Sequence, residues 1–211
     1  MMKQAFLAAA ALLALCAATF PNPPAQRIAE GAGMQKIVLA GGCFWGMEAV
    51  FESLRGVKSA VAGYSGGSAA TAHYEIVSTG TTGHAESVEI TFDPAKISFG
   101  QLLQVYFSVA HDPTELNRQG PDVGSQYRSV IFYANDAQKQ LAQAYIRELT
   151  AKHVFKDPIV TQVVPLKAFY PAEAYHQHFV ERHPNYPYVV YEDLPKLQAL
   201  RQDYPSLLKR S

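Results

Sequence analysis

Residues 37–46 read IVLAGGCFWG, and the start of the fold follows from this stretch. The apolar run 37–40 predicts a buried strand. After the glycines, apolar residues recur at helical spacing as far as Leu54, and Gly56 is placed to end that helix. Cys43 is therefore predicted to lie where a strand turns, through two glycines, into the first turn of a helix.

This position has chemical consequences for Cys43. Unpaired backbone N–H groups point out of a helix N-terminus, and the helix macrodipole adds partial positive charge there. Both favour a thiolate, so we expect the pKa of Cys43 to lie below the ~8.5 of a free cysteine. The alternative is an inert, small buried cysteine. The adjacent aromatic pair, Phe44 and Trp45, and the flanking glycines favour a reactive thiol.

The composition is that of a globular protein. The chain has 211 residues, of which 48% are hydrophobic and 17% charged, and its formal net charge is zero. These values indicate one domain with a core and argue against general disorder. Because no long basic run is present, we expect no nucleic-acid partner.

The N-terminus is predicted to be a separate segment. Residues 5–20 carry no charge, a lysine precedes them, and three prolines lie within 21–24. This pattern is typical of a secretory signal peptide. We therefore expect residues 1–24 to be a signal peptide with a proline-rich junction, residues 25–211 to form a single domain, and the protein to be exported, to the periplasm. The alternatives are a membrane anchor left uncleaved and a lipid attached to Cys16, the second disfavoured by the leucine before it.

Removal of the signal peptide would leave Cys43 as the only cysteine, because Cys16 is the other of the two. No disulfide could then form within one molecule. A lone thiol exported to an oxidising compartment is a hazard, which argues against an incidental role.

Four further blocks carry side chains capable of acid–base chemistry or hydrogen bonding. Each also has an ordinary interpretation, as a packing tyrosine, a solvated edge glutamate, a structural histidine or a surface turn. The blocks are GYSGG at 63–67 followed by Tyr74, TGHAE at 82–86 with His84 and Glu86, the loop 117–129 with Asp122 and Tyr127, and FYPAEAYHQ at 169–177.

Together with GGCFWG, these blocks resemble, in the same order, the signatures of the A-type peptide methionine sulfoxide reductases. The resemblance covers about residues 36–205, and several separate motifs in order make it specific. It implies reduction of methionine S-sulfoxide, protein-bound and free, to methionine, and hence repair of oxidised proteins. The resemblance also implies a catalytic set of Cys43, Glu86, Tyr74 and Tyr127 and a substrate-binding set of Phe44, Trp45 and Asp122. In the family, Asn-Pro-Thr usually precedes the tyrosine that corresponds to Tyr74, whereas this chain has Thr71-Ala72-His73 there.

The chemistry of these residue types fits this reaction. Sulfoxide sulfur is a poor electrophile until its oxygen is protonated, so the reaction needs a thiolate, an acid and hydrogen-bond donors. Glu86 must be protonated to act as the acid, and burial raises the pKa of a carboxyl group. Phe44 and Trp45 can form an apolar wall that buries Glu86 and accepts the S-methyl group.

The product on the enzyme would be a sulfenic acid of Cys43. Family members often resolve it with cysteines near the C-terminus, but residues 188–211 contain no sulfur. We therefore expect a form with a single catalytic cysteine, recycled by an external thiol or a thioredoxin-like protein, with no cofactor. No metal is expected, because no cysteine or carboxylate completes a familiar spacing with His176, His178 and His183.

Strands and helices mix along the chain without strict alternation. This pattern predicts an α+β two-layer sandwich with a mixed sheet and packed helices. The resemblance implies the same class with a ferredoxin-like core, and we expect a monomer. The further strands are predicted at 57–62, 87–92, 130–133 and 159–164, and the further helices at about 98–110 and 136–152.

Three other functions are left open by the sequence. A peroxide-reducing enzyme would also form a sulfenate but would not need Tyr74, Glu86 and Tyr127. A cysteine–histidine acyl transferase could use His84 or His176, although no feature places either beside the thiol. A secreted peptide-binding domain would leave the thiol idle.

Overall fold

The computed structural model describes residues 20–24 and 33–209. Residues 1–19 of the predicted signal peptide, Cys16 among them, lie outside the described residues. Among the residues that are described, no helix combines the length and the apolar character that crossing a membrane requires.

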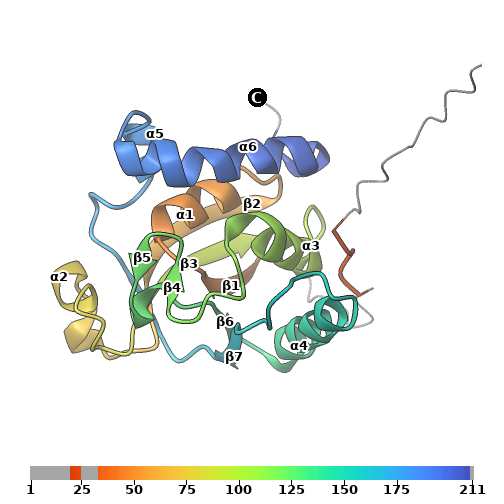
Figure 1. Cartoon of the computed structure of the whole chain (residues 1–211), viewed down its shortest axis with the longest axis horizontal. Coiled ribbons are helices and arrows are strands. Elements are labelled where there is room, and N and C mark those ends of the chain that lie inside the picture. Colours follow the sequence, from red (N-terminus) through yellow and green to blue (C-terminus); the bar gives the residue numbers. More distant parts are fainter. Residues whose placement is uncertain (1–19, 25–32, 210–211) are drawn as a thin grey trace, which may run out of the picture.

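A six-stranded sheet forms the centre of the molecule (Figure 1). Its strand order is β7-β6-β1-β3-β2-β8. Neighbouring strands are antiparallel except β6 and β7, which are parallel, so the sheet is mixed as predicted. The strands are β1 (Gln35–Ala40), β2 (Val57–Ser65), β3 (Ala85–Phe92), β6 (Val130–Tyr133), β7 (Gln162–Pro165) and β8 (Phe169–Pro171); β4 (Arg118–Gln119) and β5 (Asp122–Val123) form a separate hairpin.

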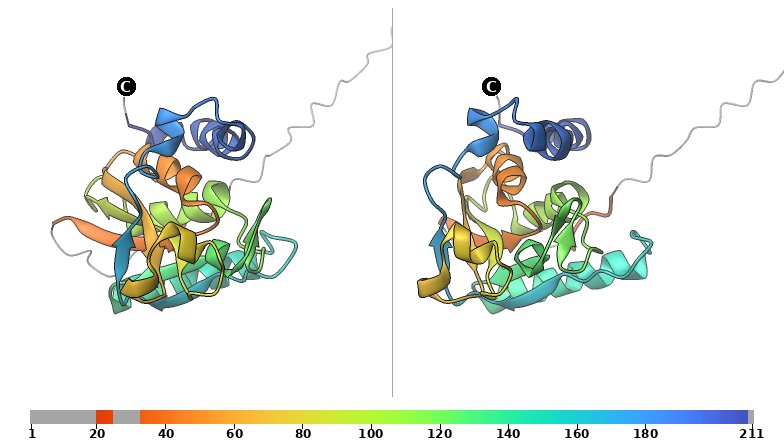
Figure 2. Two further views of the ribbon diagram at one scale, coloured as in Figure 1. Left: turned by 90° about the vertical axis from the view of Figure 1, so that its left-hand side faces the viewer. Right: turned by 60° about the vertical axis from the view of Figure 1, so that its left-hand side comes forward.

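The helices complete an α+β fold, which confirms the predicted class. Figures 1 and 2 show α6 lying over α1, which separates α6 from the sheet, so this helix adds a layer to the two that the sequence predicts. The helices are α1 (Phe44–Glu52), α2 (Tyr74–Val77), α3 (Phe99–Val105), α4 (Asp136–Ala151), α5 (Phe179–Arg182) and α6 (Leu194–Asp203), with π-helical turns at Tyr106–Ala110 and Val189–Asp193.

The core explains why the first strand reads as an unbroken apolar run. Side chains alternate between the faces of a strand. Ile37 and Leu39 belong to the large cluster formed with α1 and α3, whereas Val38 and Ala40 belong to a smaller cluster with residues of β6. Because both faces of β1 are covered, every position in its second half is apolar.

Two of the predicted helices begin with a side-chain cap. The Ser98 hydroxyl accepts a hydrogen bond from the Gln101 N–H, and the Gln101 side chain accepts one from the Ser98 N–H. The Asn135 side chain likewise accepts from the Gln138 N–H at the start of α4. These side chains satisfy N–H groups that would otherwise have no partner within the helix.

Strand boundaries differ from the sequence prediction where long-range pairing decides them. β2 continues to Ser65, past the turn predicted at 63–67, because Tyr64 and Ser65 pair with β3 on one side and with β8 on the other. Only at Gly66, with φ of +106°, does the chain turn. β3 begins at Ala85, so Glu86 lies inside a strand, and β7 begins three residues later than predicted.

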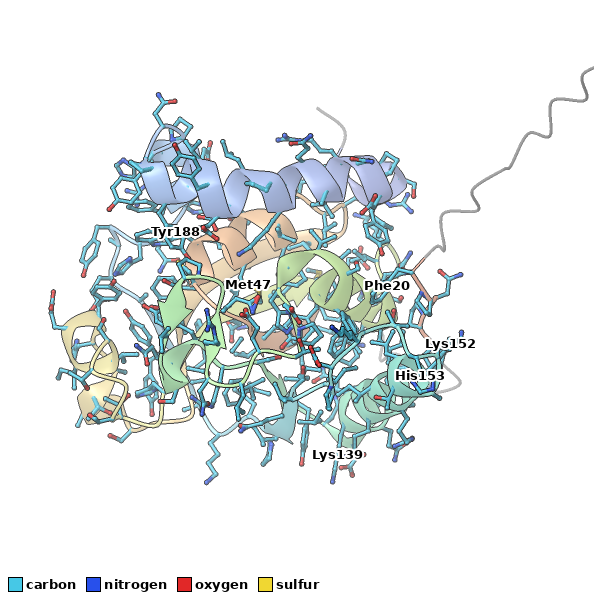
Figure 3. All side chains as sticks on the ribbon, in the orientation of Figure 1. Phe20, Met47, Lys139, Lys152, His153 and Tyr188 are labelled. Atoms are coloured by element: carbon cyan, nitrogen blue, oxygen red, sulfur yellow. The ribbon has the colours of Figure 1, made fainter. Side chains whose placement is uncertain are left out.

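Residues 20–24 pack against the domain. The Tyr145 hydroxyl of α4 donates to the Pro21 carbonyl at 2.6 Å, and the Gln104 amide of α3 lies 3.3–3.4 Å from the carbonyls of Phe20 and Pro21. The Phe20 ring meets the edge of Phe155. Figure 3 shows Phe20 beside α3 on the right of the molecule. The proline-rich junction is therefore docked on the fold.

Candidate active site

The turn between β1 and α1 is held by close contacts at its two glycines. Gly42 has φ of +92°, and a Cβ atom there would lie 2.6 Å from Cγ of Gln119. A Cβ atom at Gly41 would lie 2.7 Å from the ring of His111. Burial lowers the pKa of His111 to about 4, so its neutral ring is a fixed packing partner. The chain therefore needs glycine at both positions to place Cys43 at the N-cap of α1.

A pocket of about 170 Å³ opens at this helix N-terminus. It brings together all seven side chains that the sequence analysis assigns to catalysis or substrate binding. They come from segments far apart in the chain, namely α1, α2, β3, the β4–β5 hairpin and the 3₁₀ turn Ser125–Tyr127. The lining residues are Cys43, Phe44, Trp45, Tyr74, Glu86, Asp122, Tyr127, Tyr186 and Tyr188.

The environment of Cys43 corrects one expectation. Its side chain is 8% exposed. Burial, followed by the negative charges of Glu86 and Asp193, raises the pKa of Cys43 well above its usual value. The Trp45 N–H at the helix start and the charge of Lys196 lower it, but they are outweighed. The prediction of a lowered pKa is therefore wrong for the protein without substrate, because desolvation exceeds the effect of the helix N-terminus.

Glu86 carries the proton that an acid requires. The side chain is 3% exposed, and Oε2 accepts a hydrogen bond from the Phe44 N–H at 3.1 Å. Burial raises the pKa of Glu86 to about 8; the Phe44 N–H lowers it and the Asp122 charge raises it. The carboxyl group is thus mostly protonated at neutral pH, as the sequence analysis expects.

Two tyrosine hydroxyls of the pocket stay protonated and can donate hydrogen bonds. The pKa of Tyr127 is raised by burial and by the charges of Glu86 and Asp122. The pKa of Tyr74 is also raised, first by burial. The backbone N–H of Tyr74 donates to Glu173 at 3.0 Å, which anchors the start of α2.

Aromatic rings form the apolar side of the pocket. The Trp45 ring stacks on Phe179 with 3.7 Å between centroids and 7° between planes. Its Nε1–H donates to Nδ1 of His176 at 3.0 Å. Phe44 is buried and packs against the same histidine, with ring centroids 5.0 Å apart. These contacts fix the orientation of both rings.

The histidines have partners other than the thiol. The His84 ring accepts from the Gly67 N–H through Nδ1 and lies 3.0 Å from the Ser68 carbonyl through Nε2, as a structural histidine does. His176 lies behind the aromatic wall, where Nδ1 accepts from Trp45. This arrangement gives no support to the cysteine–histidine alternative.

The C-terminal region contributes two tyrosines to the pocket that the sequence did not predict. Tyr186 and Tyr188 line the pocket, and the Tyr188 hydroxyl donates to Asp122. Figure 3 shows Tyr188 below the C-terminal helices and near the start of α1. The buried Asp193 lies against Gly46 of α1, with Lys196 3.7 Å away. In a chain with 12 tyrosines, no local pattern distinguishes these two.

The fold and the pocket define a class of enzyme in which a cysteine at a helix N-terminus shares a small cavity with a protonated carboxyl group and tyrosine hydroxyls. The chain belongs to the peptide methionine sulfoxide reductase family, whose model matches residues 35–207. It therefore reduces methionine sulfoxide to methionine, and the electrons come from a thiol reductant without a prosthetic cofactor.

Relatives in other organisms show how much of the chain is shared. Peptide methionine sulfoxide reductase MsrA 2 of Mesorhizobium japonicum is 58% identical over 175 residues, which cover 83% of this chain and 90% of the relative. MsrA 2 of Synechocystis is also 58% identical over 177 residues, or 84% of this chain and 83% of the relative.

Solved structures agree in fold. Mxr1 from Saccharomyces cerevisiae in reduced form has a TM-score of 0.68 and 33% identity, with 72% of this chain and 87% of that chain covered. Methionine sulfoxide reductase A of Corynebacterium diphtheriae has a TM-score of 0.63 and 33% identity, with 74% and 77% covered.

Proposed function

We propose that Cys43 attacks the sulfur of methionine S-sulfoxide while Glu86 gives its proton to the sulfoxide oxygen. The observation that carries this proposal is the shared pocket of about 170 Å³, in which the thiol and a carboxyl group of pKa about 8 are both buried. The hydroxyls of Tyr74 and Tyr127 are the donors that hold the oxygen.

The electron balance of the step is simple. The sulfoxide sulfur gains two electrons and its S–O bond breaks, while the Cys43 sulfur loses two electrons and takes the oxygen as a sulfenic acid. Methionine leaves, and two external thiols then reduce the sulfenic acid, forming a disulfide between themselves and water.

The raised pKa of Cys43 has to be overcome during this step. Protonation of Glu86 removes the negative charge that is the second cause of the raised pKa of Cys43, after burial. The Trp45 N–H and the Lys196 charge already favour the thiolate. We propose that the nucleophilic thiolate forms next to a neutral Glu86, so that the two groups are not charged at the same time.

The pocket size bears on the substrate. A cavity of about 170 Å³ accommodates the sulfoxide end of one side chain, with the main chain left outside. Both protein-bound and free methionine sulfoxide fit this arrangement, and repair of oxidised proteins follows from the first. The pocket lining combines an acid and hydroxyls, which suit the oxygen, with aromatic rings, which suit the methyl group. We propose that only one epimer satisfies both sets of contacts, and family membership supports the S epimer.

Recycling is proposed to use one cysteine. Within 25–211 the sequence contains only Cys43, so the reductant must come from outside, as a small thiol or a thioredoxin-like protein.

The test is a single turnover on each epimer of a methionine sulfoxide peptide, without added thiol. We expect one methionine per enzyme from the S epimer, a Cys43 adduct with a sulfenic-acid trap, and steady turnover once dithiothreitol is added. Faster turnover of peroxide than of the peptide, or equal turnover of the two epimers, would contradict the proposal.

We also propose that the protein is exported, that its signal peptide is removed, and that the mature protein is a monomer. The docking of Phe20 and Pro21 on α3 and α4 supports cleavage before residue 20. Mass spectrometry of the mature protein tests the cleavage site; an intact residue 1 or a lipid on Cys16 would contradict it.

We propose that the centre of the fold is a ferredoxin-like core. The strand order β6-β1-β3-β2, with α1 and α3 as the connecting helices, supports this proposal.

A further inference from the structure

Trp45 also lines a second and larger groove, of about 480 Å³, whose lining residues come largely from α1, α5 and α6. Figure 1 shows these three helices close together. None of the catalytic side chains proposed above lines it. Its polar side chains come from α1 and its C-cap, from α5 and its N-cap, and from the C-terminal region: Glu48, Glu52, Ser53, His178, Glu181, Arg201 and Lys209.

Three of these side chains converge. Glu48 and Glu52 lie one turn apart on α1 and therefore point to the same side of the helix. Each of Glu48, Glu52 and His178 offers one ligand atom, and these atoms lie within 4.8 Å of one another. Nδ1 of His178 is 3.0 Å from Oε1 of Glu52.

Glu48 supplies the independent sign that a ligand belongs here. The residue is 1% exposed, and its Oε2 accepts from the His178 N–H at 2.8 Å. Its buried Oε1 accepts no hydrogen bond among the described residues; the Ala62 N–H is near this carboxylate but donates to the Gln177 side chain at 3.0 Å. A buried oxygen without a partner is costly, and a cation between the two carboxylates would satisfy it.

We propose that Glu48, Glu52 and His178 bind a divalent transition-metal ion, with Zn²⁺ the best match. An imidazole with two carboxylates is a nitrogen and oxygen donor set that suits Zn²⁺, and three protein ligands leave one position for water. The Glu52 and His178 side chains are 27% and 52% exposed, so an ion can reach them from the groove.

The distances require little movement. With bonds of about 2.0–2.1 Å, two ligands of a tetrahedral ion lie ~3.3 Å apart. Glu52 and His178 are already close to this separation, so mainly the Glu48 carboxylate has to approach, by at most ~1.5 Å. Sequence spacing gives no sign of the site, because His178 lies 126 and 130 residues after the two glutamates.

The test titrates Zn²⁺ into the chelator-treated, reduced mature protein, followed by calorimetry and by fluorescence. Trp45 is the only tryptophan and lines the groove, so its emission reports on the site. We expect one ion per chain. Glu52→Gln and His178→Ala should each weaken binding by more than about tenfold, since loss of even an outer partner of a metal ligand has that effect.

Matched variants separate the site from other Zn²⁺ ligands. Glu181→Gln lies in the same groove outside the trio, His183→Ala removes a neighbouring exposed histidine, and Cys43→Ser removes the thiol. These three should bind as the native protein does. Circular dichroism confirms that each variant is folded. Absence of saturable binding, equal affinity in His178→Ala, or loss of binding in Cys43→Ser would overturn the proposal, whatever the outcome for reductase activity.

Discussion

Glu48, a residue of α1, and Glu86, which is bonded to the start of α1, are two buried glutamates with similar environments and different proposed roles. Glu86 and Glu48 are 3% and 1% exposed, and each accepts one backbone N–H, from Phe44 and His178 respectively. Burial is the largest cause of the raised pKa in both, to about 8 and about 7.

Their neighbours make the difference. Glu86 shares its pocket with a thiol and with tyrosine hydroxyls, so its proton can be transferred to a bound substrate. Glu48 faces a second carboxylate and an imidazole, so its negative charge is compensated by a cation. A buried carboxyl group of raised pKa is thus not by itself a catalytic residue, and its partners decide its role.

The largest expected difference between the two glutamates appears in kcat when each is replaced by glutamine. Glu86→Gln should lower kcat for a methionine sulfoxide peptide by about 10²–10⁴ and leave KM within a few-fold, because a general acid is lost and the shape is kept. Glu48→Gln makes the same replacement of a carboxyl group by an amide, and its kcat should stay within about threefold of the native value. Steady-state kinetics with dithiothreitol measures both. Equal losses in the two variants would remove the distinction.

Loss of a tyrosine hydroxyl should have a smaller effect. Tyr127→Phe removes one donor to the sulfoxide oxygen and should lower kcat on the order of 10². Tyr191→Phe is the matched control, because Tyr191 is 76% exposed. Unchanged turnover in Tyr127→Phe would mean that this hydroxyl does not hold the oxygen.

The pH dependence sharpens the role of Glu86. The reactive form pairs a neutral Glu86 with a Cys43 thiolate, and the pKa of Cys43 lies above that of Glu86. The single-turnover rate should therefore rise with pH as the thiolate forms and level off near pH 8, where loss of the Glu86 proton offsets the gain in thiolate. In Glu86→Gln the slower rate should keep rising past pH 8, because no acid is left to lose its proton. Rapid-quench measurements between pH 6 and 10 follow the two profiles, and a plateau that persists near pH 8 in Glu86→Gln would assign it to another group.

The smallest expected effect is on the pH dependence of the free energy of unfolding, and it reports on Glu48. Its pKa is raised from 4.5 to about 7 on folding, so between those values the folded state binds more protons than the unfolded state. Stability therefore falls as pH rises from about 4.5 to 7 and levels off above. Glu48→Gln should flatten this decline. Urea unfolding at pH 5 and pH 8, with chelator present, measures it, and an unaltered slope would contradict the raised pKa.

What sequence could predict here was largely local. The two glycines and the apolar runs around Cys43 specify a strand–turn–helix unit, and Ser98 and Asn135 specify helix starts, since these effects act over a few residues. The seven site residues were found through ordered motifs, and the structure brings them into one pocket.

What sequence could not predict depends on distant segments. β2 extends to Ser65 because β8 pairs with it from more than 100 residues away. The pKa of Cys43 is raised instead of lowered because burial and the charge of Asp193, 150 positions later, act on it. Tyr188, in the C-terminal region, also lines the pocket because the fold brings distant segments together. No periodicity around the thiol contains this information.

The central claim, that the sulfur of Cys43 takes the oxygen from methionine sulfoxide, is tested most directly by Cys43→Ser. Methionine formation in a single turnover should be compared between this variant and the native protein, at equal thermal stability. The account predicts that the variant forms no measurable methionine and no sulfenic-acid adduct. Undiminished reduction by a correctly folded serine variant would contradict it.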